Sequence, residues 1–336
     1  MVETSRRAFM LATAGATLAA GMTSARAAGE GGLRLVAFER KNQPGMRVGV
    51  VLAGDTVVDF VDAKKAGAAL DFDPSSMIAL IAAGAPALAQ VRALAAKPGA
   101  TLALADLRLH SPIPRPPRNI FAVGWNYLEH FNESETAQKT AQQNYPEHPV
   151  FFSKASHSMN GPFDPIPFDP AVSTLIDWEG ELAVVIGKGG RNIKEADAMD
   201  HVFGYSVIND TTARDVQAKK HGGQWFKGKS LDGHGPMGPW IVTADALDPD
   251  KLHLQTRVNG VVKQDAMTTQ MYFKIPRIIA ELSLGLTLEP GDVIATGTPP
   301  GVGNARKPPE YLKPGDVMET EIEGIGIIRN TITQVA

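Results

Sequence analysis

The chain has 336 residues, of which 43% are hydrophobic and 21% are charged, a composition typical of a folded globular protein. Its formal net charge of −3 excludes the strongly basic surface that nucleic acids or anionic membranes attract. There is no cysteine, which excludes disulfides, thiolate metal sites and a cysteine nucleophile. The 33 glycines and 24 prolines favour many turns and short strands over a helical bundle.

Residues 1–28 have the features of a targeting segment. Ser5–Met10 (SRRAFM) is a twin-arginine signature, Leu11–Met22 is weakly apolar, and Ala25–Ala27 is an A-x-A-like cleavage site. We therefore predict a twin-arginine signal peptide and export to the periplasm. The alternatives are an amphipathic N-terminal helix or a membrane anchor, although the apolar run is too short to span a bilayer. No other segment is expected to cross a membrane.

The rest of the chain divides at a proline-rich stretch. Residues 29–110 are predicted to form a small N-terminal β/α domain, with an antiparallel sheet over 33–62 and one or two helices over 74–96. Residues 111–118 (SPIPRPPR) cannot form regular structure and are expected to be a linker. Residues 119–336 are then the main domain, and the fold class is α+β and β-rich.

Two elements near the C-terminus have clear local signals. The segment Leu252–Lys263 alternates on both sides of Asn259-Gly260, a strong β-hairpin turn signal. Residues 275–284 carry apolar side chains at helical spacing and predict an amphipathic helix. Both elements fit a mixed, strand-rich domain.

The main domain contains an acidic strand, Asp177–Gly187 (DWEGELAVVIG). Alternate side chains of a strand point to the same face, so Asp177, Glu179 and Glu181 are expected to share one face. Carboxylates in register repel one another and are costly to bury unless a cation joins them. Oxygen ligands without cysteine suit a hard divalent ion such as Mg²⁺ or Mn²⁺. The alternative is a solvated strand end that is merely acidic.

A second strand, Val202–Asp210, also ends in an acid, which is well placed to complete a metal site with the preceding acidic strand. Thr211-Thr212 is expected to cap the helix that follows. On that helix Arg214 and Gln217 lie three residues apart, so both can face an anionic substrate. Alternatively, Arg214 is an ordinary charge of the first helical turn.

Two glycine-rich loops offer further polar groups. Lys229 lies between glycine and serine in the irregular stretch 224–239, where it can reach a ligand. In Ala295–Gly303, backbone N–H groups and the Thr298 hydroxyl are available to a carboxylate or an enolate. The chain has no P-loop, no dinucleotide fingerprint and no α/β-hydrolase elbow.

His130 and Glu133 are three residues apart and would share one face of a helix. A carboxylate beside an imidazole raises its pKa and fixes its orientation, as a general base requires. The alternative is a surface histidine with an incidental acidic neighbour. Residues 132–149 are polar without an apolar stripe, which is more typical of a mobile lid than of core.

From about Asn119 to Asn330 the chain resembles the fumarylacetoacetate hydrolase family. The resemblance rests on several motifs in the family's order and spacing: Gly-Trp-Asn-Tyr-x-x-His-x-x-Glu, Asp-Trp-Glu-Gly-Glu-Leu-Ala, Asn-Asp-Thr-Thr-Ala-Arg-Asp-x-Gln, Gly-Lys-Ser-x-Asp and Thr-Gly-Thr-Pro-x-Gly-Val-Gly. Membership implies a mixed β-sandwich roll as the catalytic domain, usually in a homodimer. The chain is most similar to the shorter branch of acylpyruvases and 2-hydroxyhepta-2,4-diene-1,7-dioate isomerases.

The resemblance also implies a set of site residues. It implies one divalent cation, Mg²⁺ or Mn²⁺, on two glutamates and one aspartate, which match Glu179, Glu181 and Asp210. The family's catalytic histidine–glutamate dyad matches His130 and Glu133, and its catalytic lysine matches Lys229. Its substrate-binding groups match Arg214, Gln217 and Thr298. The predicted export signal departs from the family, whose members are mostly cytosolic.

The predicted reaction is metal-dependent hydrolysis of a C–C bond in a 1,3-diketo acid of the acylpyruvate or fumarylpyruvate type. The metal would polarise the oxo acid, and His130, oriented by Glu133, would activate a water. The close alternatives on the same site are decarboxylation of oxaloacetate-like acids and isomerisation of 2-hydroxydienoates. More distant alternatives are an exported dicarboxylate-binding protein without catalysis and a purely structural domain.

Overall fold

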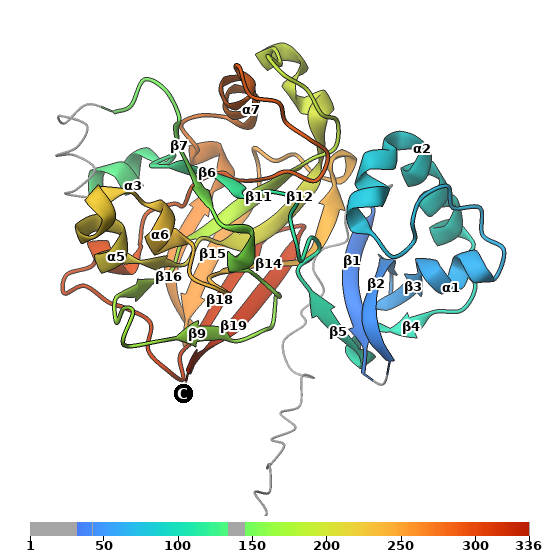
Figure 1. Cartoon of the computed structure of the whole chain (residues 1–336), viewed down its shortest axis with the longest axis horizontal. Helices are drawn as coiled ribbons and strands as arrows, with labels where there is room; N and C mark the ends of the chain where they lie inside the picture. Colours follow the sequence, from blue (N-terminus) through green and yellow to red (C-terminus); the bar gives the residue numbers. More distant parts are fainter. Residues whose placement is uncertain (1–31, 42, 134–144, 336) are drawn as a thin grey trace, which may run out of the picture.

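The structure is a computed structural model, and it describes residues 32–41, 43–133 and 145–335 (Figure 1). Most strands belong to one large mixed sheet. Its order is β4 (Leu102–Ala103), β3 (Thr56–Asp59), β2 (Gln43–Leu52), β1 (Arg34–Arg40), β14 (Gly235–Thr243), β12 (Val202–Asn209), β11 (Gly180–Ile186), β17 (Val293–Ala295), β6 (Ile120–Gly124) and β7 (Val150–Lys154). Two further strands, β5 (Leu107–His110) and β8 (Met159–Asn160), pair with β1 and β14.

A second sheet packs on the first and closes a β-sandwich. Its order is β16 (Val261–Met267), β15 (His253–Val258), β18 (Val317–Ile322), β19 (Gly326–Gln334) and β9 (Ile166–Phe168). The β15–β16 hairpin turns at Asn259 and Gly260, whose φ angles of 51° and 77° are those of a tight two-residue turn. The expected hairpin and the strand-rich α+β class are therefore confirmed.

Gly180, the glycine between the two glutamates of the acidic motif, lies at a close approach of the two sheets. A Cβ atom at this position would lie 2.2 Å from Thr256 Oγ1 on β15 and 2.8 Å from Thr320 Cγ2 on β18. The motif therefore needs glycine here for packing between the sheets, whatever its acidic neighbours do.

We expect Gly180→Ala to lower the free energy of unfolding by about 1–3 kcal/mol, because the added methyl group must push two buried threonines apart. Gly99→Ala is the matched control, since a Cβ atom there meets no atom within 4 Å. Urea denaturation of both variants measures the effect. If Gly180→Ala were as stable as the control, the close approach of the sheets would not limit this position.

The N-terminal part contains the expected antiparallel sheet, β1 to β3, together with α1 (Phe60–Lys65) and α2 (Met77–Ala96). Figure 1 shows both helices on the same side of the molecule. β1 also pairs with β14, with Leu35 opposite Ile241, so one sheet runs from this part into the rest of the chain. The division into domains at residues 110 and 119 stays a prediction.

The helix α2 is kinked, because Gly84 has a φ of 63° and Pro86 follows it. Two helices meet at this kink, within the range that the sequence predicted. Among the described residues α2 is long and apolar enough to cross a membrane by length and composition. Five of its side chains pack into the core: Met77, Leu80, Ile81, Ala87 and Val91.

The other helices of the described residues lie around the sandwich. They are α3 (Leu128–Glu133), α5 (Arg214–Lys219), α6 (Phe226–Lys229) and α7 (Ile275–Ser283). Figure 1 shows α3, α5 and α6 together on the side of the molecule opposite α1 and α2. Short 3-10 segments complete the described part of the fold: η1 (Leu104–Asp106), η2 (Ser156–Ser158), η3 (Glu195–His201), η4 (His221–Gly223), η5 (Ala244–Ala246), η6 (Thr268–Gln270) and η7 (Gly303–Ala305).

The predicted threonine cap of α5 is wrong. The cap residue is Ala213, which makes no side-chain capping bond. The Thr212 hydroxyl instead donates to the carbonyl oxygen of Asp210 at 2.8 Å, and Thr212 belongs to the short strand β13 (Thr212–Ala213), paired with β10 (Ile176–Asp177). The threonine therefore shapes the corner after Asp210 and leaves the helix end uncapped.

Candidate metal and catalytic site

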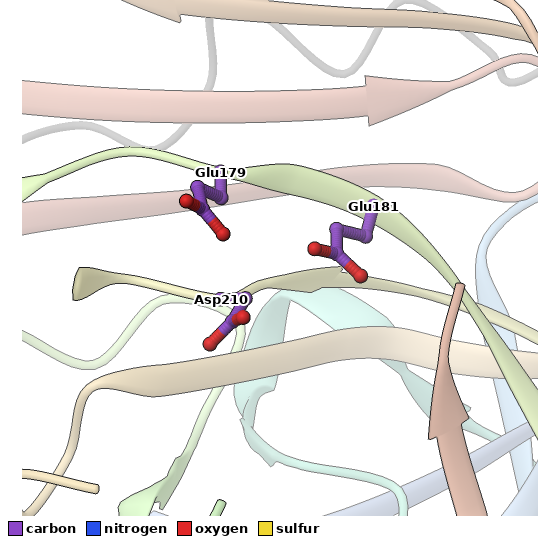
Figure 2. Close-up of side chains that lie close together, drawn as sticks. All are labelled: Glu179, Glu181 and Asp210. Carbon is purple, nitrogen blue, oxygen red and sulfur yellow. The ribbon is translucent and has the colours of Figure 1, made fainter. Parts of the chain in front are cut away.

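Three buried carboxylates meet where β11 begins and β12 ends. Glu181 lies on β11, Glu179 just before it, and Asp210 just after β12. The antiparallel register sets Gly180 opposite Asn209, and the Asp210 N–H donates to the Glu179 carbonyl at 2.8 Å. Candidate ligand atoms of the three side chains lie within 4.8 Å of one another (Figure 2). We call these three residues the acidic triad.

The acidic stretch is not one continuous strand, contrary to the prediction. β10 ends at Asp177 and β11 begins at Gly180, so Trp178 and Glu179 lie in the interruption. The Asp177 carboxylate turns to other partners, accepting from the N–H groups of Gly303 at 2.7 Å and Asn304 at 3.0 Å. Asp177 therefore anchors the 303–304 loop and lies outside the triad.

Three basic side chains surround the triad among the described residues. Lys229 Nζ donates to Asp210 Oδ2 at 2.7 Å and also to Glu179 Oε2. The Arg214 guanidinium is shared between Glu179 Oε1 at 2.8 Å and Asp177 Oδ2 at 2.7 Å. Lys154 Nζ forms an ion pair with Asp210 Oδ1 at 2.8 Å. Glu179 and Asp210 are thus held in place by cations.

Glu179 and Glu181 respond to burial in opposite ways. Burial alone would raise the pKa of Glu179, but the Lys229 ammonium and the Arg214 guanidinium outweigh it and hold this pKa at about 2. Burial, followed by the charges of Asp210 and Glu179, raises the pKa of Glu181 well above its ordinary value. Its carboxylate accepts the Gly297 N–H, 2.7 Å from Oε2. Glu181 is therefore the carboxylate that lacks a compensating cation of its own.

These residues fit a hard divalent cation. All candidate ligand atoms are carboxylate oxygens, which Mg²⁺ and Mn²⁺ prefer. Asp210 Oδ1 is buried and faces Lys154 Nζ at 2.8 Å, and a carboxylate oxygen with two lone pairs can accept a further cation beside this contact. The cluster already contains an ammonium group between Glu179 and Asp210, which shows that its geometry suits positive charge.

The predicted dyad lies over this cluster. His130 Nδ1 is 2.8 Å from Glu133 Oε1, and the Glu133 carboxylate also accepts the Gly301 N–H at 2.9 Å. His130 is only 6% exposed and lies close enough to lower the pKa of Glu179 by its charge. Glu133 therefore leaves His130 Nε2 as the ring nitrogen available for proton transfer. Of the expected lid, residues 134–144 lie outside the described residues.

The predicted substrate-binding groups already have protein partners. Arg214 Nη1 donates to Gln217 Oε1 at 3.2 Å, so these two residues do lie together on α5 as expected. The Thr298 hydroxyl donates to the Gly180 carbonyl at 3.0 Å and accepts from Gln264 Nε2 at 2.7 Å. Thr298 thus supports the backbone between the two glutamates, and substrate binding by these three residues stays a prediction.

Sequence patterns do not indicate Lys154 or Gln264 as supports of the site, and they place Asp177 with Glu179 and Glu181. Lys154 carried a weak signal, a cation directly at the end of a short apolar strand. Asp177 was grouped with the wrong acids, because strand alternation takes no account of the break after it. Gln264 lies on a hairpin strand far away in sequence, so no local pattern indicates its bonds to Thr298 and to the Gly180 N–H at 3.0 Å.

A separate cleft of about 1030 Å³ lies between β1, β2 and the outer face of β15, β18 and β19. None of the triad or dyad residues lines it. Its arginines pair with acids, for example Arg257 with Glu321 at 2.6 Å and Arg329 with Glu319. The cleft therefore offers no uncompensated charge for a ligand, and the chemistry stays with the triad.

His234 makes a pH-dependent contribution to stability. It is buried, and its Nε2 lies 2.8 Å from the Pro167 carbonyl. Burial, the larger effect, and the nearby Lys154 charge lower the pKa of His234 to about 4. This folded-state pKa lies below the ordinary value of about 6.5, so the unfolded chain binds more protons than the folded one between pH 6.5 and 4. The free energy of unfolding therefore decreases as the pH is lowered through this window.

We expect the free energy of unfolding to fall by roughly 3 kcal/mol between pH 7 and pH 4 because His234 becomes protonated on unfolding. In His234→Gln this part of the pH dependence should be absent. Urea denaturation of both proteins across this range measures the difference. Glutamine keeps an amide donor for the Pro167 carbonyl but does not titrate. An equal decline in both proteins would contradict the assignment to His234.

Comparison with known proteins shows what this chain is related to. Residues 119–333 match the family profile described as "Fumarylacetoacetate (FAA) hydrolase C-terminal". The oxaloacetate tautomerase YisK of Bacillus subtilis is 42% identical over 296 residues, covering 85% of this chain and 96% of the relative. The mitochondrial oxaloacetate tautomerase fahd2 of Xenopus laevis is 42% identical over 305 residues, covering 89% of this chain and 90% of the relative.

Solved structures support the same family relationship. A fumarylacetoacetate hydrolase from Exiguobacterium antarcticum has a TM-score of 0.76 at 40% identity, covering 90% of this chain and 100% of that chain. A maleylpyruvate hydrolase from Sphingobium sp. SYK-6, solved with manganese(II) and pyruvate, has a TM-score of 0.71 at 32% identity, with 90% and 100% covered.

The prediction of twin-arginine export to the periplasm is wrong in the light of these relatives, several of which are named as mitochondrial proteins. Its physical basis was weak, because Arg-containing, Ala-rich N-terminal stretches with few acids are shared by several kinds of targeting segment. Residues 1–28 themselves lie outside the described residues. The family profile, the near-full-length relatives and the buried acidic triad together establish that this chain is an enzyme of the fumarylacetoacetate hydrolase family.

Proposed function

We propose that this enzyme interconverts the enol and keto forms of oxaloacetate or a closely similar C4 oxo-dicarboxylic acid. The observation that carries the proposal is the His130–Glu133 pair over a buried acidic triad that fits a divalent cation. Relatives at 42% identity are named oxaloacetate tautomerases, which favours proton transfer over the hydrolysis that the sequence put first. Oxaloacetate-like acids were among its alternatives.

In this proposal Glu179, Glu181 and Asp210 hold Mg²⁺ or Mn²⁺, which supplies a Lewis acid for the oxo-acid oxygens. His130 Nε2 takes the proton from C3 of the keto form, and the electron pair of the C–H bond becomes the C2–C3 double bond. The C2 oxygen then takes a proton to give the enol. No atom is gained or lost, and Glu133 keeps the imidazole in the orientation that this transfer needs.

Other side chains complete the proposed site. The Lys229 ammonium sits among the carboxylates, where it can offset charge that develops on the enolate oxygen. Burial lowers the pKa of Lys229, but Asp210 and Glu179 outweigh it and raise this pKa, so the ammonium form is maintained. Arg214, Gln217 and Thr298 are the proposed substrate-side groups. The homodimer implied by the family resemblance also remains part of the proposal.

The test is the ultraviolet decay of enol-oxaloacetate, followed with protein and Mn²⁺, with Mn²⁺ alone, and with protein and excess chelator. We expect faster decay only with both protein and metal, and no pyruvate in a lactate dehydrogenase assay. Pyruvate formation would indicate decarboxylation instead. Rapid loss of an acylpyruvate without any effect on enol-oxaloacetate would overturn the proposal in favour of hydrolysis, the activity named for the manganese-bound neighbour.

A further inference from the structure

Lys154 is a buried cation that the proposed reaction does not use. It is the last residue of β7, and its side chain is 0% exposed. Its Nζ lies 2.8 Å from Asp210 Oδ1, donates to the Lys229 carbonyl and reaches the Thr211 carbonyl at 3.4 Å. Three oxygen atoms around one nitrogen match an ammonium group, which has three donors and no acceptor.

All of these contacts lead to one ion pair of the site. Asp210 and Lys229 are joined at 2.7 Å. Lys154 holds Asp210 through its carboxylate and through the carbonyl of the following residue, Thr211. It holds Lys229 through the Lys229 backbone carbonyl. The three segments involved are β7, the corner after β12 and the end of α6, which are far apart in sequence. Lys154 therefore fixes where Asp210 and Lys229 stand relative to each other.

Lys154 also changes the charge balance of the site. Asp177 and the acidic triad contribute four carboxyl groups, whereas Arg214 and Lys229 contribute two cations. A buried carboxylate without a partner is strongly destabilising, so a third cation stabilises the cluster when no metal is bound. Burial, together with the Lys229 charge, lowers the pKa of Lys154, and the Asp210 carboxylate acts against this. In its ammonium form Lys154 repels any divalent ion that enters the cluster, because solvent screens the buried charge little.

We propose that Lys154 is a positioning residue and a resident counter-charge of the metal site. It holds Asp210 and Lys229 in register, stabilises the metal-free fold and weakens the binding of the divalent ion. This inference rests on the proposed metal-dependent function, but its test needs metal alone and no substrate. If the oxaloacetate assay fails, the effect of Lys154 on metal binding can therefore still be tested separately from the proposed activity.

The test compares Lys154→Met with the wild-type protein by thermal unfolding and by calorimetric titration with Mn²⁺. Methionine has nearly the same length and no charge. We expect a lower Tm without metal, a larger rise of Tm on adding Mn²⁺, and Mn²⁺ binding about tenfold tighter because the repulsion is gone. If Lys154 only filled space, Tm would fall equally with and without metal, and an unchanged Mn²⁺ affinity would overturn the proposal.

Lys154→Gln covers the case in which the methionine variant does not fold, since glutamine keeps an N–H donor for the carbonyls but no charge. It is expected to bind Mn²⁺ more tightly as well, and weaker binding would overturn the counter-charge role. Lys188→Met is the matched control, because Lys188 is exposed and remote from the triad contacts. It is expected to change neither Tm nor Mn²⁺ affinity.

Discussion

Glu181→Gln is expected to weaken Mn²⁺ binding by about 100-fold or more, because loss of groups that only support metal ligands already costs 10–100-fold. Glutamine keeps an oxygen for the Gly297 N–H, 2.7 Å away in the wild-type protein. Activity on enol-oxaloacetate should fall with metal occupancy. Calorimetric titration and the enol assay, each at several Mn²⁺ concentrations, measure both effects.

The metal-free variant should be at least as stable as the wild type at neutral pH. Burial and the neighbouring carboxylates raise the folded-state pKa of Glu181. A carboxyl with a raised folded-state pKa contributes stability below its unfolded pKa of about 4.3 and loses it as pH rises through the folded value. Its stabilising contribution therefore declines as pH rises, and a neutral amide removes the cost of burying the charged carboxylate. Loss of folding without metal would contradict this account. Glu179→Gln should destabilise, because it removes one of the two carboxylate partners of both Lys229 and Arg214.

His130→Gln is expected to lower kcat for tautomerisation by about 10²- to 10⁴-fold, the usual effect of removing a general acid–base group. The imidazole is the group that Glu133 orients, and glutamine cannot exchange a proton near neutral pH. Mn²⁺ affinity should change little, because His130 is not one of the triad residues. Enol decay at saturating Mn²⁺ and substrate, with a parallel metal titration, provides the measurement.

Glu133→Gln serves as the graded control. Its amide can still accept from the Gly301 N–H and from His130, so we expect the loss of kcat to be smaller than for His130→Gln. Full activity of His130→Gln would remove the dyad from the mechanism. A parallel loss of metal binding would instead indicate that the histidine mainly supports the fold of the site.

The acidic triad shows how much of a site local pattern can predict. Glu179 and Glu181 were recognised because two acids enter a buried apolar strand, and Asp210 because a second strand ends in an acid. The antiparallel pairing of β11 with β12 then brings the three carboxylates together. Helix spacing placed Arg214 beside Gln217 and His130 beside Glu133 in the same way. Each of these predictions relied only on residues within one helix or on two strands that follow each other in the sequence.

Partners that come from distant segments could not be predicted. Asp177 follows the same alternation as the glutamates, but the strand is interrupted after it, and its carboxylate binds the 303–304 loop. Thr212 has the composition of a helix cap, but its hydroxyl bonds to Asp210. Asp177 is held by tertiary hydrogen bonds, whereas the Thr212 hydroxyl takes another local partner, a carbonyl two residues away, in place of the helix end.

The sequence by itself determined the strand-rich fold, its hairpin and helices, and the residue types that gather in the site, because apolar periodicity and turn chemistry act over a few residues. Only the tertiary structure decided the charge of that site. Glu179, beside Lys229 and Arg214, has a low pKa, whereas Glu181, two residues later, has a raised pKa. Burial and the distance to a cation set this difference, and both arise only when β7, β11, β12 and α6 meet.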